Sequence, residues 1–372
     1  MKCPRCQHDN APGVKSRAEG GPRPAATCPA CVPSNPPSRK ACARRWLLAL
    51  SAALLALLAA PLAAEAQQPV RAHRIGYLAA TGAPAAAHLV EAFRQGLRDL
   101  GHVEGKNIVI EYRWADGRYE RLPDLAAELV RLKVDVILAV VQPAALAARG
   151  ATSTIPIVMA ASLDPVGAGL VASLARPGGN VTGLTSSVGP EIAGKHLELL
   201  TAAVPGTSRV AILWNPAHPA YPALVREAGG AARSLGAQLQ VLEARSPDEF
   251  DGGFTAMVRE RAGALLLLGG DPMFFLHRSR LVDLATRNRL PTMCGIREYV
   301  EAGCLMAYAT NTRDLWRRAA TYVDRILKGA RPGDLPVEQP TKFDLVINMK
   351  AARALGLTIP PALPARADQV IE

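Results

Sequence analysis

From residue 73 onward, the sequence alternates between short apolar segments and amphipathic segments. Segments such as 73–80 (HRIGYLAA) and 134–141 (VDVILAVV) have the length and apolar character of buried strands. Segments such as 88–101 (HLVEAFRQGLRDLG) repeat apolar residues with the period of a helix and end at Gly101, a typical helix-ending residue. Apolar strands that alternate with such helices form parallel sheets covered on both faces. The sequence therefore predicts an α/β protein.

The alternation runs twice along the chain, with a break near residues 187–192. About ten strands are expected, and a single sheet of that size is unusual. We therefore predict two doubly wound parallel-sheet lobes, with helices that include 167–175 (GAGLVASLA) in the first lobe. Ligands of such sheets bind at the carboxyl ends of the strands, so the site is expected in the cleft between the lobes.

Short polar residues follow many of the predicted strands. They are Thr81, Gly82, Gln142, Ser162, Asp164, Thr185, Ser186, Asn215, Asp271 and Tyr308. Hydroxyls, amides and helix N-termini bind a small molecule by hydrogen bonds without reacting with it. These residues are therefore candidate ligand contacts. The alternative is that they cap the helices that follow, and one residue can do both.

The motifs of common catalytic and cofactor sites are absent from the sequence. No G-x-G-x-x-G follows the first strand, and no P-loop, G-x-S-x-G or H-E-x-x-H motif occurs. The scattered histidines are expected at the surface or at helix ends; they are His73, His88, His102, His196, His218 and His277. We predict no catalytic residue and no cofactor, and a protein that is not an enzyme.

The net charge of +11 raises the possibility of a nucleic-acid partner. However, residues 1–66 hold nine of the Lys and Arg residues and three of the Asp and Glu residues. The rest of the chain is closer to neutral and contains no block of basic residues. No nucleic-acid partner is predicted.

Residues 39–66 have the pattern of a secretory signal peptide. Arg39, Lys40, Arg44 and Arg45 precede an apolar run over 46–62, and Ala64-Glu65-Ala66 offers small residues for cleavage. Cleavage is expected after Ala66, which predicts a periplasmic protein. The alternative is an uncleaved membrane anchor, for which the apolar run is slightly short.

The preceding segment 1–38 is rich in Pro, Gly, Ser and Ala and is expected to be disordered. Its cysteines Cys3, Cys6, Cys28 and Cys31 have the pairwise spacing of a zinc site, but the gap between the pairs is longer than usual. No functional metal site is predicted from spacing alone, and an alternative start of translation at Val32 would remove all four of these cysteines.

Two cysteines occur beyond the signal region, Cys294 and Cys304. They flank a predicted short helix. A pair of buried free thiols is favoured over a disulfide.

Three stretches resemble the ABC-transporter substrate-binding family, which has the type I periplasmic-binding-protein fold and includes tryptophan- and tyrosine-binding members. The stretches are 162–186 (SLDPVGAGLVASLARPGGNVTGLTS), 269–275 (GGDPMFF) and 337–348 (VEQPTKFDLVIN). The resemblance extends over about residues 70–372.

This resemblance implies that the chain crosses a hinge three times. It implies a first lobe of residues 70–188 plus 310–333 and a second of 189–309 plus 334–372. Ligand contacts carried over by position are Thr81, Gly82, Gln142, Ser162, Asp164, Thr185 and Ser186 from the first lobe and Asn215, Asp271 and Gly295 from the second. Pro272 and Met273 depart from the Asn-Thr that follows the aspartate in aromatic-amino-acid binders.

The resemblance also implies the function. We expect an extracytoplasmic solute-binding protein that captures a small molecule, such as an amino acid or another small carboxylate, and delivers it to an ABC permease. The alternatives are a ligand-binding sensor of a signalling system and an enzyme of the same fold.

Overall fold

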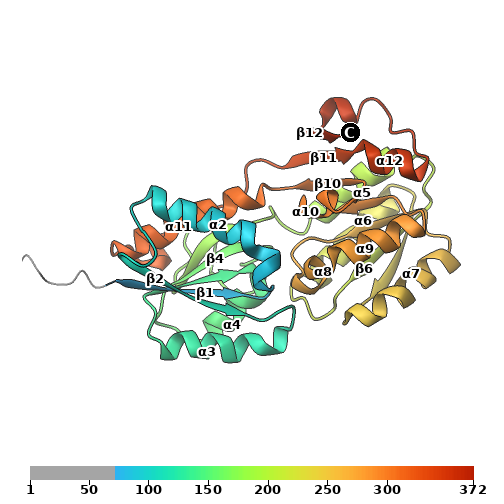
Figure 1. The fold of residues 1–372 in the computed structure, drawn as a ribbon. Helices are drawn as coiled ribbons and strands as arrows, with labels where there is room; N and C mark the ends of the chain where they lie inside the picture. The colour runs from blue at the N-terminus through green and yellow to red at the C-terminus, as the bar shows by residue number, and fades with distance from the viewer. Residues whose placement is uncertain (1–71) are drawn as a thin grey trace, which may run out of the picture. The chain divides into compact units, whose positions relative to one another are not determined.

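A computed structural model describes residues 72–372 of the chain, which form two α/β lobes (Figure 1). The first lobe holds a five-stranded parallel sheet with the order β2-β1-β3-β4-β5. Its strands are β1 (His73–Ala79), β2 (Ile108–Trp114), β3 (Val136–Val140), β4 (Ile157–Ser162) and β5 (Val181–Thr185).

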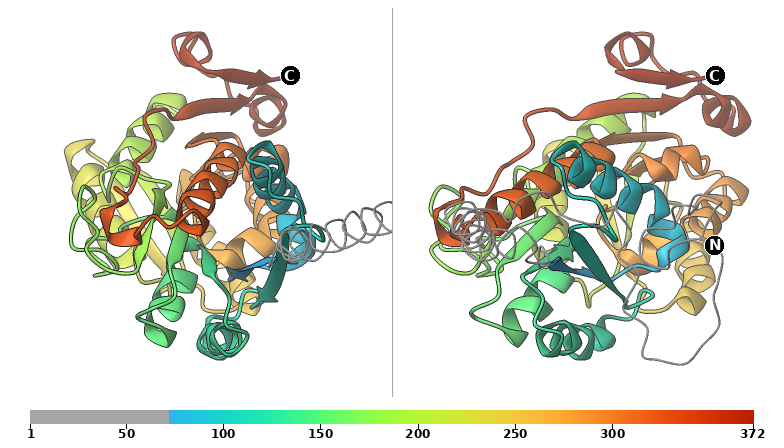
Figure 2. Two further views of the ribbon diagram at one scale, coloured as in Figure 1. Left: turned by 90° about the vertical axis from the view of Figure 1, so that its left-hand side faces the viewer. Right: turned by 60° about the vertical axis from the view of Figure 1, so that its left-hand side comes forward.

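Helices cover both faces of the first sheet. They are α2 (Ala83–Asp99), α3 (Leu122–Arg131), α4 (Val141–Ala151) and α11 (Thr312–Leu327), with a short 3-10 helix η2 (Tyr119–Arg121) before α3. Helices α2 and α11 lie side by side on one face, and α3 and α4 lie on the other (Figures 1 and 2). Helix α11 therefore returns to this lobe after the chain has built most of the second lobe.

The second lobe holds a seven-stranded sheet with the order β12-β11-β10-β9-β8-β6-β7. Its strands are β6 (Arg209–Trp214), β7 (Gln238–Glu243), β8 (Ala264–Leu267), β9 (Thr292–Cys294), β10 (Met306–Ala309), β11 (Asp344–Asn348) and β12 (Gln369–Ile371). The prediction of two doubly wound lobes is confirmed. The expectation of purely parallel sheets is wrong at one place, because β11 runs antiparallel to β10.

The helices of the second lobe also lie on both faces of its sheet. They are α5 (Ile192–Ala203), α6 (Tyr221–Ser234), α7 (Phe250–Arg259), α8 (Pro272–Leu276), α9 (Arg278–Arg287), α10 (Glu298–Glu301) and α12 (Met349–Leu355), with 3-10 helices η3 (Pro247–Glu249) and η5 (Pro364–Arg366) in the connections. The 3-10 helix η4 (Pro332–Asp334), which follows α11, packs against β5 of the first lobe. Helices α5 and α6 share one core with alternate residues of β6, and α7 and α9 share another with the remaining residues.

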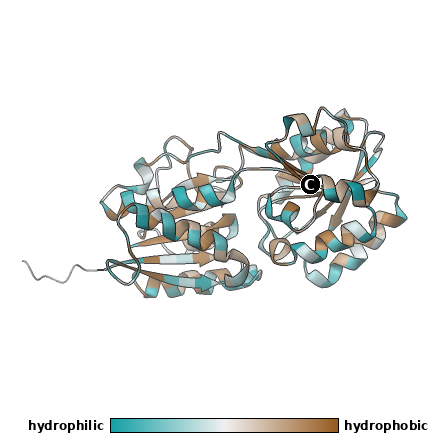
Figure 3. Ribbon diagram, turned by 45° about the horizontal axis from the view of Figure 1, so that its top comes forward, coloured by the Kyte–Doolittle hydropathy of each residue, from teal (hydrophilic) through white to brown (hydrophobic). Residues whose placement is uncertain are grey.

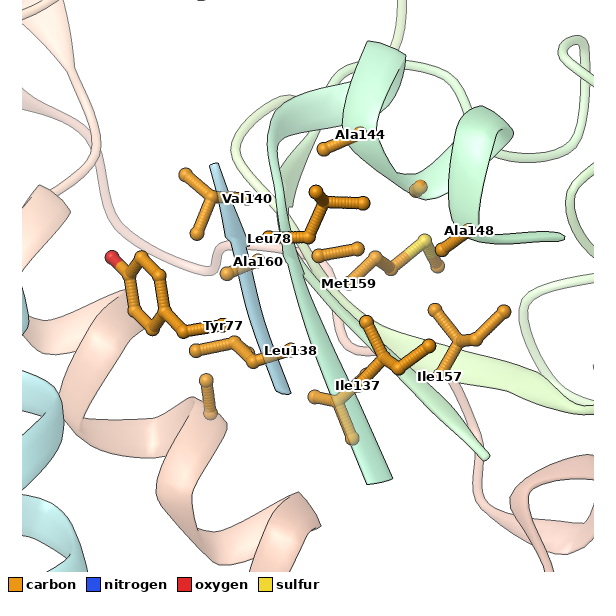
Figure 4. Close-up of a cluster of buried hydrophobic side chains, with 14 of the residues drawn as sticks. Tyr77, Leu78, Ile137, Leu138, Val140, Ala144, Ala148, Ile157, Met159 and Ala160 are labelled. Carbon is orange, nitrogen blue, oxygen red and sulfur yellow. The ribbon is translucent and has the colours of Figure 1, made fainter. Parts of the chain in front are cut away.

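Inner strands such as β3, β4 and β8 form because their side chains are buried and almost all apolar on both faces of the sheet, as the brown strand segments show (Figure 3). Tyr77 and Leu78 are neighbours on β1 and point to opposite sides of the sheet (Figure 4). The hydroxyl of Tyr77 accepts a hydrogen bond from Nε1 of Trp316 on α11, at 2.9 Å. Both residues are buried. Successive residues of one strand therefore attach helices to the two faces of the sheet.

The predicted helix 167–175 does not form, and that prediction is wrong. The segment between β4 and β5 consists of turns. Gly169 has a φ of 67°, and the amide of Gly167 bonds to the side chain of Asp164 instead of continuing a helix. Apolar spacing alone did not reveal these local turns.

The predictions for residues 1–66, including the signal peptide and the zinc-like cysteines, concern residues outside the described part of the chain. Within 72–372, no helix combines the length and the apolar character needed to cross a membrane. The same part of the chain contains no group of three or more side chains that would ligate a metal.

Gly96 sets how closely α2 approaches α11. A Cβ atom at this position would lie 2.5 Å from the carbonyl oxygen of Arg317 and 2.9 Å from the Cβ of Ala320. We expect Gly96→Ala to lower the free energy of unfolding by about 1–3 kcal/mol, because the two helices must move apart. Urea-induced unfolding measures this change.

Gly150→Ala is the matched control, because Gly150 lies in α4 and has no neighbouring atom within 4 Å of the added methyl group. We expect it to raise the free energy of unfolding by about 0.5–1 kcal/mol, as alanine does in a helix. Equal effects of the two substitutions would contradict the close approach at Gly96.

Candidate functional site

The cleft between the lobes is the candidate functional site. It contains about 930 Å³ of space between protein atoms, part of which is open to solvent. The predicted residues that line it are Thr81, Ser186, Asp271, Gly295 and Tyr308. They come from the ends of strands in both sheets, where parallel pairing brings the carboxyl ends together.

Six predicted residues do not line this cleft: Gly82, Gln142, Ser162, Asp164, Thr185 and Asn215. Gln142 is buried, and its Oε1 accepts hydrogen bonds from the Ser162 hydroxyl at 3.3 Å and from the Asp164 amide at 2.9 Å. These bonds tie the end of β4 to α4. Asp164 and Thr185 instead line a second hollow beside the connection from β5 to α5.

Among the predicted residues, the side chain of Asp271 caps a helix and that of Asn215 caps a turn. Oδ1 of Asp271 accepts a hydrogen bond from the Phe274 amide at 2.8 Å and caps α8. Oδ1 of Asn215 accepts one from the Ala217 amide at 3.0 Å. Asp271 is both a cap and a cleft residue, whereas Asn215 holds a turn next to the cleft and lies within hydrogen-bonding reach of Asp271.

Asp271 accepts a hydrogen bond that joins the two lobes. The Tyr119 hydroxyl, from the first lobe, donates to Oδ2 of Asp271 at 2.7 Å. Burial raises the pKa of the Asp271 carboxyl, although the hydrogen bonds from Phe274 and Tyr119 act to lower it. Burial and then the charge of Asp271 raise the pKa of Tyr119, which therefore keeps its proton and donates.

Further contacts join the lobes at the rim of the cleft. Nε2 of His88 on α2 lies 3.4 Å from Oε1 of Glu298 on α10. The side chain of Leu276 lies against the first lobe, where a Cβ at Gly117 would be 3.0 Å from its Cδ1. Gly117 has a φ of 78°, which also favours glycine there. The lobes are therefore in a closed arrangement.

Two strained backbone positions lie at the cleft. Val141 and Ala161 line it and have φ values of 61° and 60°. A positive φ is unusual for alanine and more so for a β-branched residue. Such strain concentrates at binding sites. It was not foreseen, because the residue types give no sign of it.

Most of the remaining lining is apolar and includes aromatic rings. Trp316 of α11 and Phe275 of α8 line the cleft. Tyr308 and Phe343 also line it and stack on each other with ring centroids 5.3 Å apart. Of these residues, only Tyr308 was predicted. Trp316 and Phe275 lie within helices and Phe343 precedes β11, so the strand-end rule does not find them.

Two ionisable residues of the cleft were also missed, His196 and Glu298. The expectation that histidines lie at the surface or at helix ends is wrong for His196 and His218, both of which are buried. Nε2 of His196 donates to the Tyr308 carbonyl oxygen at 2.7 Å, which leaves Nδ1 as an acceptor. Burial lowers the pKa of His196 to about 4, against the opposing effect of that hydrogen bond, so the ring is neutral near pH 7.

The expectation of two free thiols is also wrong, because Cys294 and Cys304 form a disulfide. Cys294 ends β9, next to the cleft residue Gly295, and pairs with Ala307 of the adjacent β10. Cys304 lies just before β10, so the short connection through α10 brings the two sulfurs together. Adjacent pairing of β9 and β10 was not part of the sequence prediction.

The neutral His196 predicts a pH dependence of stability. In the unfolded chain its pKa returns to about 6.5, so below that pH the unfolded chain binds more protons at this residue than the folded one. The contribution of His196 to stability is therefore present above about pH 6.5 and is lost as the pH falls toward 4. Burial lowers the pKa of His218 to about 3, so the stability that His218 contributes is also lost as the pH falls. Burial raises the pKa of Asp271, so the stability that Asp271 contributes is instead lost as the pH rises.

We expect the loss of unfolding free energy between pH 6.5 and 4 to be about 3 kcal/mol smaller in His196→Gln than in the unsubstituted protein. Glutamine keeps a donor for the Tyr308 carbonyl but does not titrate. Urea unfolding at a series of pH values measures the difference. An unchanged slope in His196→Gln would contradict the buried neutral ring.

Comparison with known proteins supports this arrangement. The family model for ABC transporter substrate binding proteins matches residues 74–371. A tyrosine-binding protein of Clostridioides difficile (strain R20291) is 27% identical over 267 residues, which cover 72% of this chain and 76% of that protein.

Two solved structures have similar sequence identity to the chain but differ in structural similarity to it. An ABC domain of Streptococcus pneumonia in complex with L-Trp has a TM-score of 0.75 and 27% identity, covering 81% of this chain and 100% of that one. The ligand-free, open structure of a substrate-binding protein with adhesive properties from Clostridium difficile has a TM-score of 0.59 and 26% identity, covering 81% and 99%.

Proposed function

Because the chain belongs to the family of ABC transporter substrate-binding proteins, with the type I periplasmic-binding-protein fold, we propose that it captures a small molecule between its lobes and delivers it to an ABC permease. The observation that carries the proposal is the cleft, which residues of both sheets line and which contacts between the lobes close. With the signal pattern of residues 39–66, the proposed location is the periplasm.

We propose an amino acid or another small carboxylate as the ligand. The names of two relatives support an amino acid, since one is a tyrosine-binding protein and the other was solved with L-Trp. The aromatic rings of Trp316, Phe275 and Tyr308 in the cleft suit an apolar or aromatic side chain. The predicted contacts Thr81, Ser186, Asp271, Gly295 and Tyr308 are the polar or backbone positions that we propose for ligand binding.

The proposed mechanism is closure of two bodies about a hinge, in which the ligand selects the closed state. The bodies are residues 70–188 plus 310–333 and residues 189–309 plus 334–372. Separate hydrophobic cores in the two lobes support this division, although Leu335 and Val337 pack in the first core. The higher TM-score with the L-Trp complex than with the open structure supports a closed arrangement here.

Calorimetric titration and thermal-shift measurements of the purified chain with L-tyrosine, L-tryptophan, L-phenylalanine and small carboxylates test this function. A ligand at a hundred times its Kd should add about 2.7 kcal/mol of stability. Loss of uptake of the same compound after deletion of the gene supports transport. Unchanged uptake with loss of a transcriptional or chemotactic response would favour the sensor, and product formation would favour an enzyme.

Tyr119→Phe tests closure directly. The substitution removes the hydroxyl that donates to the buried Asp271 across the cleft. A buried carboxylate that loses a donor is destabilised by about 1–3 kcal/mol, so we expect ligand affinity to fall about 10- to 100-fold. Calorimetry measures the affinity, and small-angle scattering reports whether the ligand still compacts the protein.

Tyr112→Phe is the matched control. The Tyr112 hydroxyl accepts a hydrogen bond from Nε of Arg94 at 3.0 Å, entirely within the first lobe. We expect affinity to stay within about twofold of the unsubstituted protein, because surface contacts of this kind contribute little and do not change on closure. Equal loss of affinity in the two variants would show that the effect of Tyr119 does not come from closure.

A further inference from the structure

We propose that the disulfide between Cys294 and Cys304 holds one wall of the cleft in place, so that the chain binds its ligand tightly only in the disulfide-bonded form. The proposal rests on the proposed function, because this wall belongs to the same cleft, but it holds for a ligand of any class. Neither cysteine lines the cleft, so both act as positioning residues through their neighbours.

The shortest strand pairing of the second sheet lies between β9 and β10. Met306 pairs with Met293 and Ala307 pairs with Cys294, and these are the two paired positions of the two strands. Every other pair of neighbouring strands named above is joined at three or more positions. We call this junction the β9–β10 seam. Few backbone hydrogen bonds hold it, so it depends more than the other junctions on further contacts.

The seam divides the second lobe into two parts. Strands β6 to β9 lie on one side, and β10, β11 and β12 form the end of the sheet on the other (Figure 1). Strand β10 leads through residues 310–311 directly into α11 of the first lobe, and the chain returns from that lobe to form β11. A shift at the seam would therefore move the strands that connect the lobes relative to the rest of the second lobe.

Residues of the cleft lie on both sides of the seam. Gly295 directly follows β9, whereas Tyr308 and Ala309 belong to β10. The connection between the two strands also contributes Ile296 and Glu298 to the lining. The shape of this wall of the cleft therefore depends on how β9 and β10 are held together.

The disulfide is a covalent link across the seam. Cys294 is the last residue of β9, and Cys304 lies two residues before the start of β10. The bond closes the connection that contains α10, a helix of only four residues, which is too short to be stable by itself. The packing of Tyr299 and Val300 in the core holds the end of this helix, and the disulfide holds the two ends of the connection.

Gly295 links the position of Cys294 to the contacts that close the cleft. A Cβ atom at Gly295 would overlap the amide nitrogen of Gly269, so the two backbones are in close contact. Gly269 also lines the cleft and lies two residues before Asp271, which accepts the hydrogen bond from Tyr119 of the first lobe. A displacement of Cys294 would therefore disturb residues that take part in closure.

The first test replaces both cysteines, as Cys294→Ala/Cys304→Ala in the full chain. Alanine keeps both positions apolar and leaves no single thiol that could pair with another cysteine. We expect ligand affinity to fall about 10- to 100-fold, because the released wall must be ordered each time the ligand binds. Calorimetry measures this with the compound of the panel above that the unsubstituted chain binds most tightly.

Val210→Ala is the matched control for a general loss of stability. Val210 is buried at the start of β6, away from the seam and from the carboxyl ends of the strands. We expect this substitution to lower the free energy of unfolding in urea, because it leaves a cavity, but to keep the affinity within about twofold. A disulfide that only stabilises the fold would behave like Val210→Ala.

Amide hydrogen exchange follows the seam without a ligand. In the double variant we expect amides of residues 292–296 and 304–309 to exchange at least about tenfold faster, while amides of β6 and β7 keep their rates. A disulfide that acts only on global unfolding would not confine the change to the seam.

The two redox states of the unsubstituted full chain provide a second comparison. Because both cysteines are buried, the chain is unfolded in urea and refolded with or without dithiothreitol. Reduction breaks the S–S bond and adds two electrons and two protons to give two thiols, while dithiothreitol is oxidised to its cyclic disulfide. We expect the reduced chain to bind as weakly as the double variant. The thiols keep the volume of the cysteine side chains, so this comparison stands even if the double variant does not fold.

Residues 1–66 contain further cysteines that also react with dithiothreitol, which are Cys3, Cys6, Cys28, Cys31 and Cys42. The double variant keeps all of them. Refolding it with and without dithiothreitol therefore measures their effect, and we expect its affinity to be the same in both cases.

The outcomes distinguish the two proposals. Unchanged affinity in the folded double variant or in the reduced chain, or exchange that is no faster at the seam than in β6 and β7, would overturn the role of the disulfide and leave the proposed function standing. Absence of binding by every compound of the panel, together with unchanged uptake after gene deletion, would contradict the proposed function. The exchange rates would still decide whether the disulfide holds this wall.

Discussion

Parallel strand pairing is the constraint on which the rest of the structure depends. It places the carboxyl ends of β1, β3, β4 and β5 at one edge of the first sheet and those of β6, β8 and β9 at one edge of the second. The residues after these strands then line one cleft from two sides. The antiparallel β11 lies on the far side of β10 and does not disturb this edge. The site therefore follows from the order of strands and helices before any particular side chain is considered.

Few polar contacts join the two lobes across the cleft. The two described above, from Tyr119 and from His88, both end on an acidic residue of the second lobe. Asp271 has its oxygens satisfied by a helix amide and by Tyr119 from the other lobe. Glu298 shares one oxygen with His88 and keeps the other unpaired. A small number of contacts suits a reversible movement, because open and closed states must differ by only a few kcal/mol for a ligand to shift their populations.

The sequence predicts the fold well because apolar strands and amphipathic helices are local patterns. It also places Thr81, Ser186 and Asp271 at the cleft, since residues after parallel strands share one edge. The sequence does not distinguish these cleft residues from Gln142, which also follows a strand but forms hydrogen bonds with Ser162 and Asp164 inside the first lobe. Glu298 and the burial of His196 are invisible in the sequence, because they depend on contacts with residues distant in the chain, such as His88 and Tyr308. The direction of β11 and the disulfide depend on strand neighbours in the same way.

Closure and ligand selection are linked through the contacts between the lobes. The Tyr119 hydroxyl of the first lobe donates to the buried Asp271 carboxylate of the second, so separation of the lobes would take this donor away from it. A ligand favours the closed state only by as much as it binds that state more tightly than the open one. The differential affinity for the closed state, rather than the total affinity, then decides which ligand the protein presents to a partner.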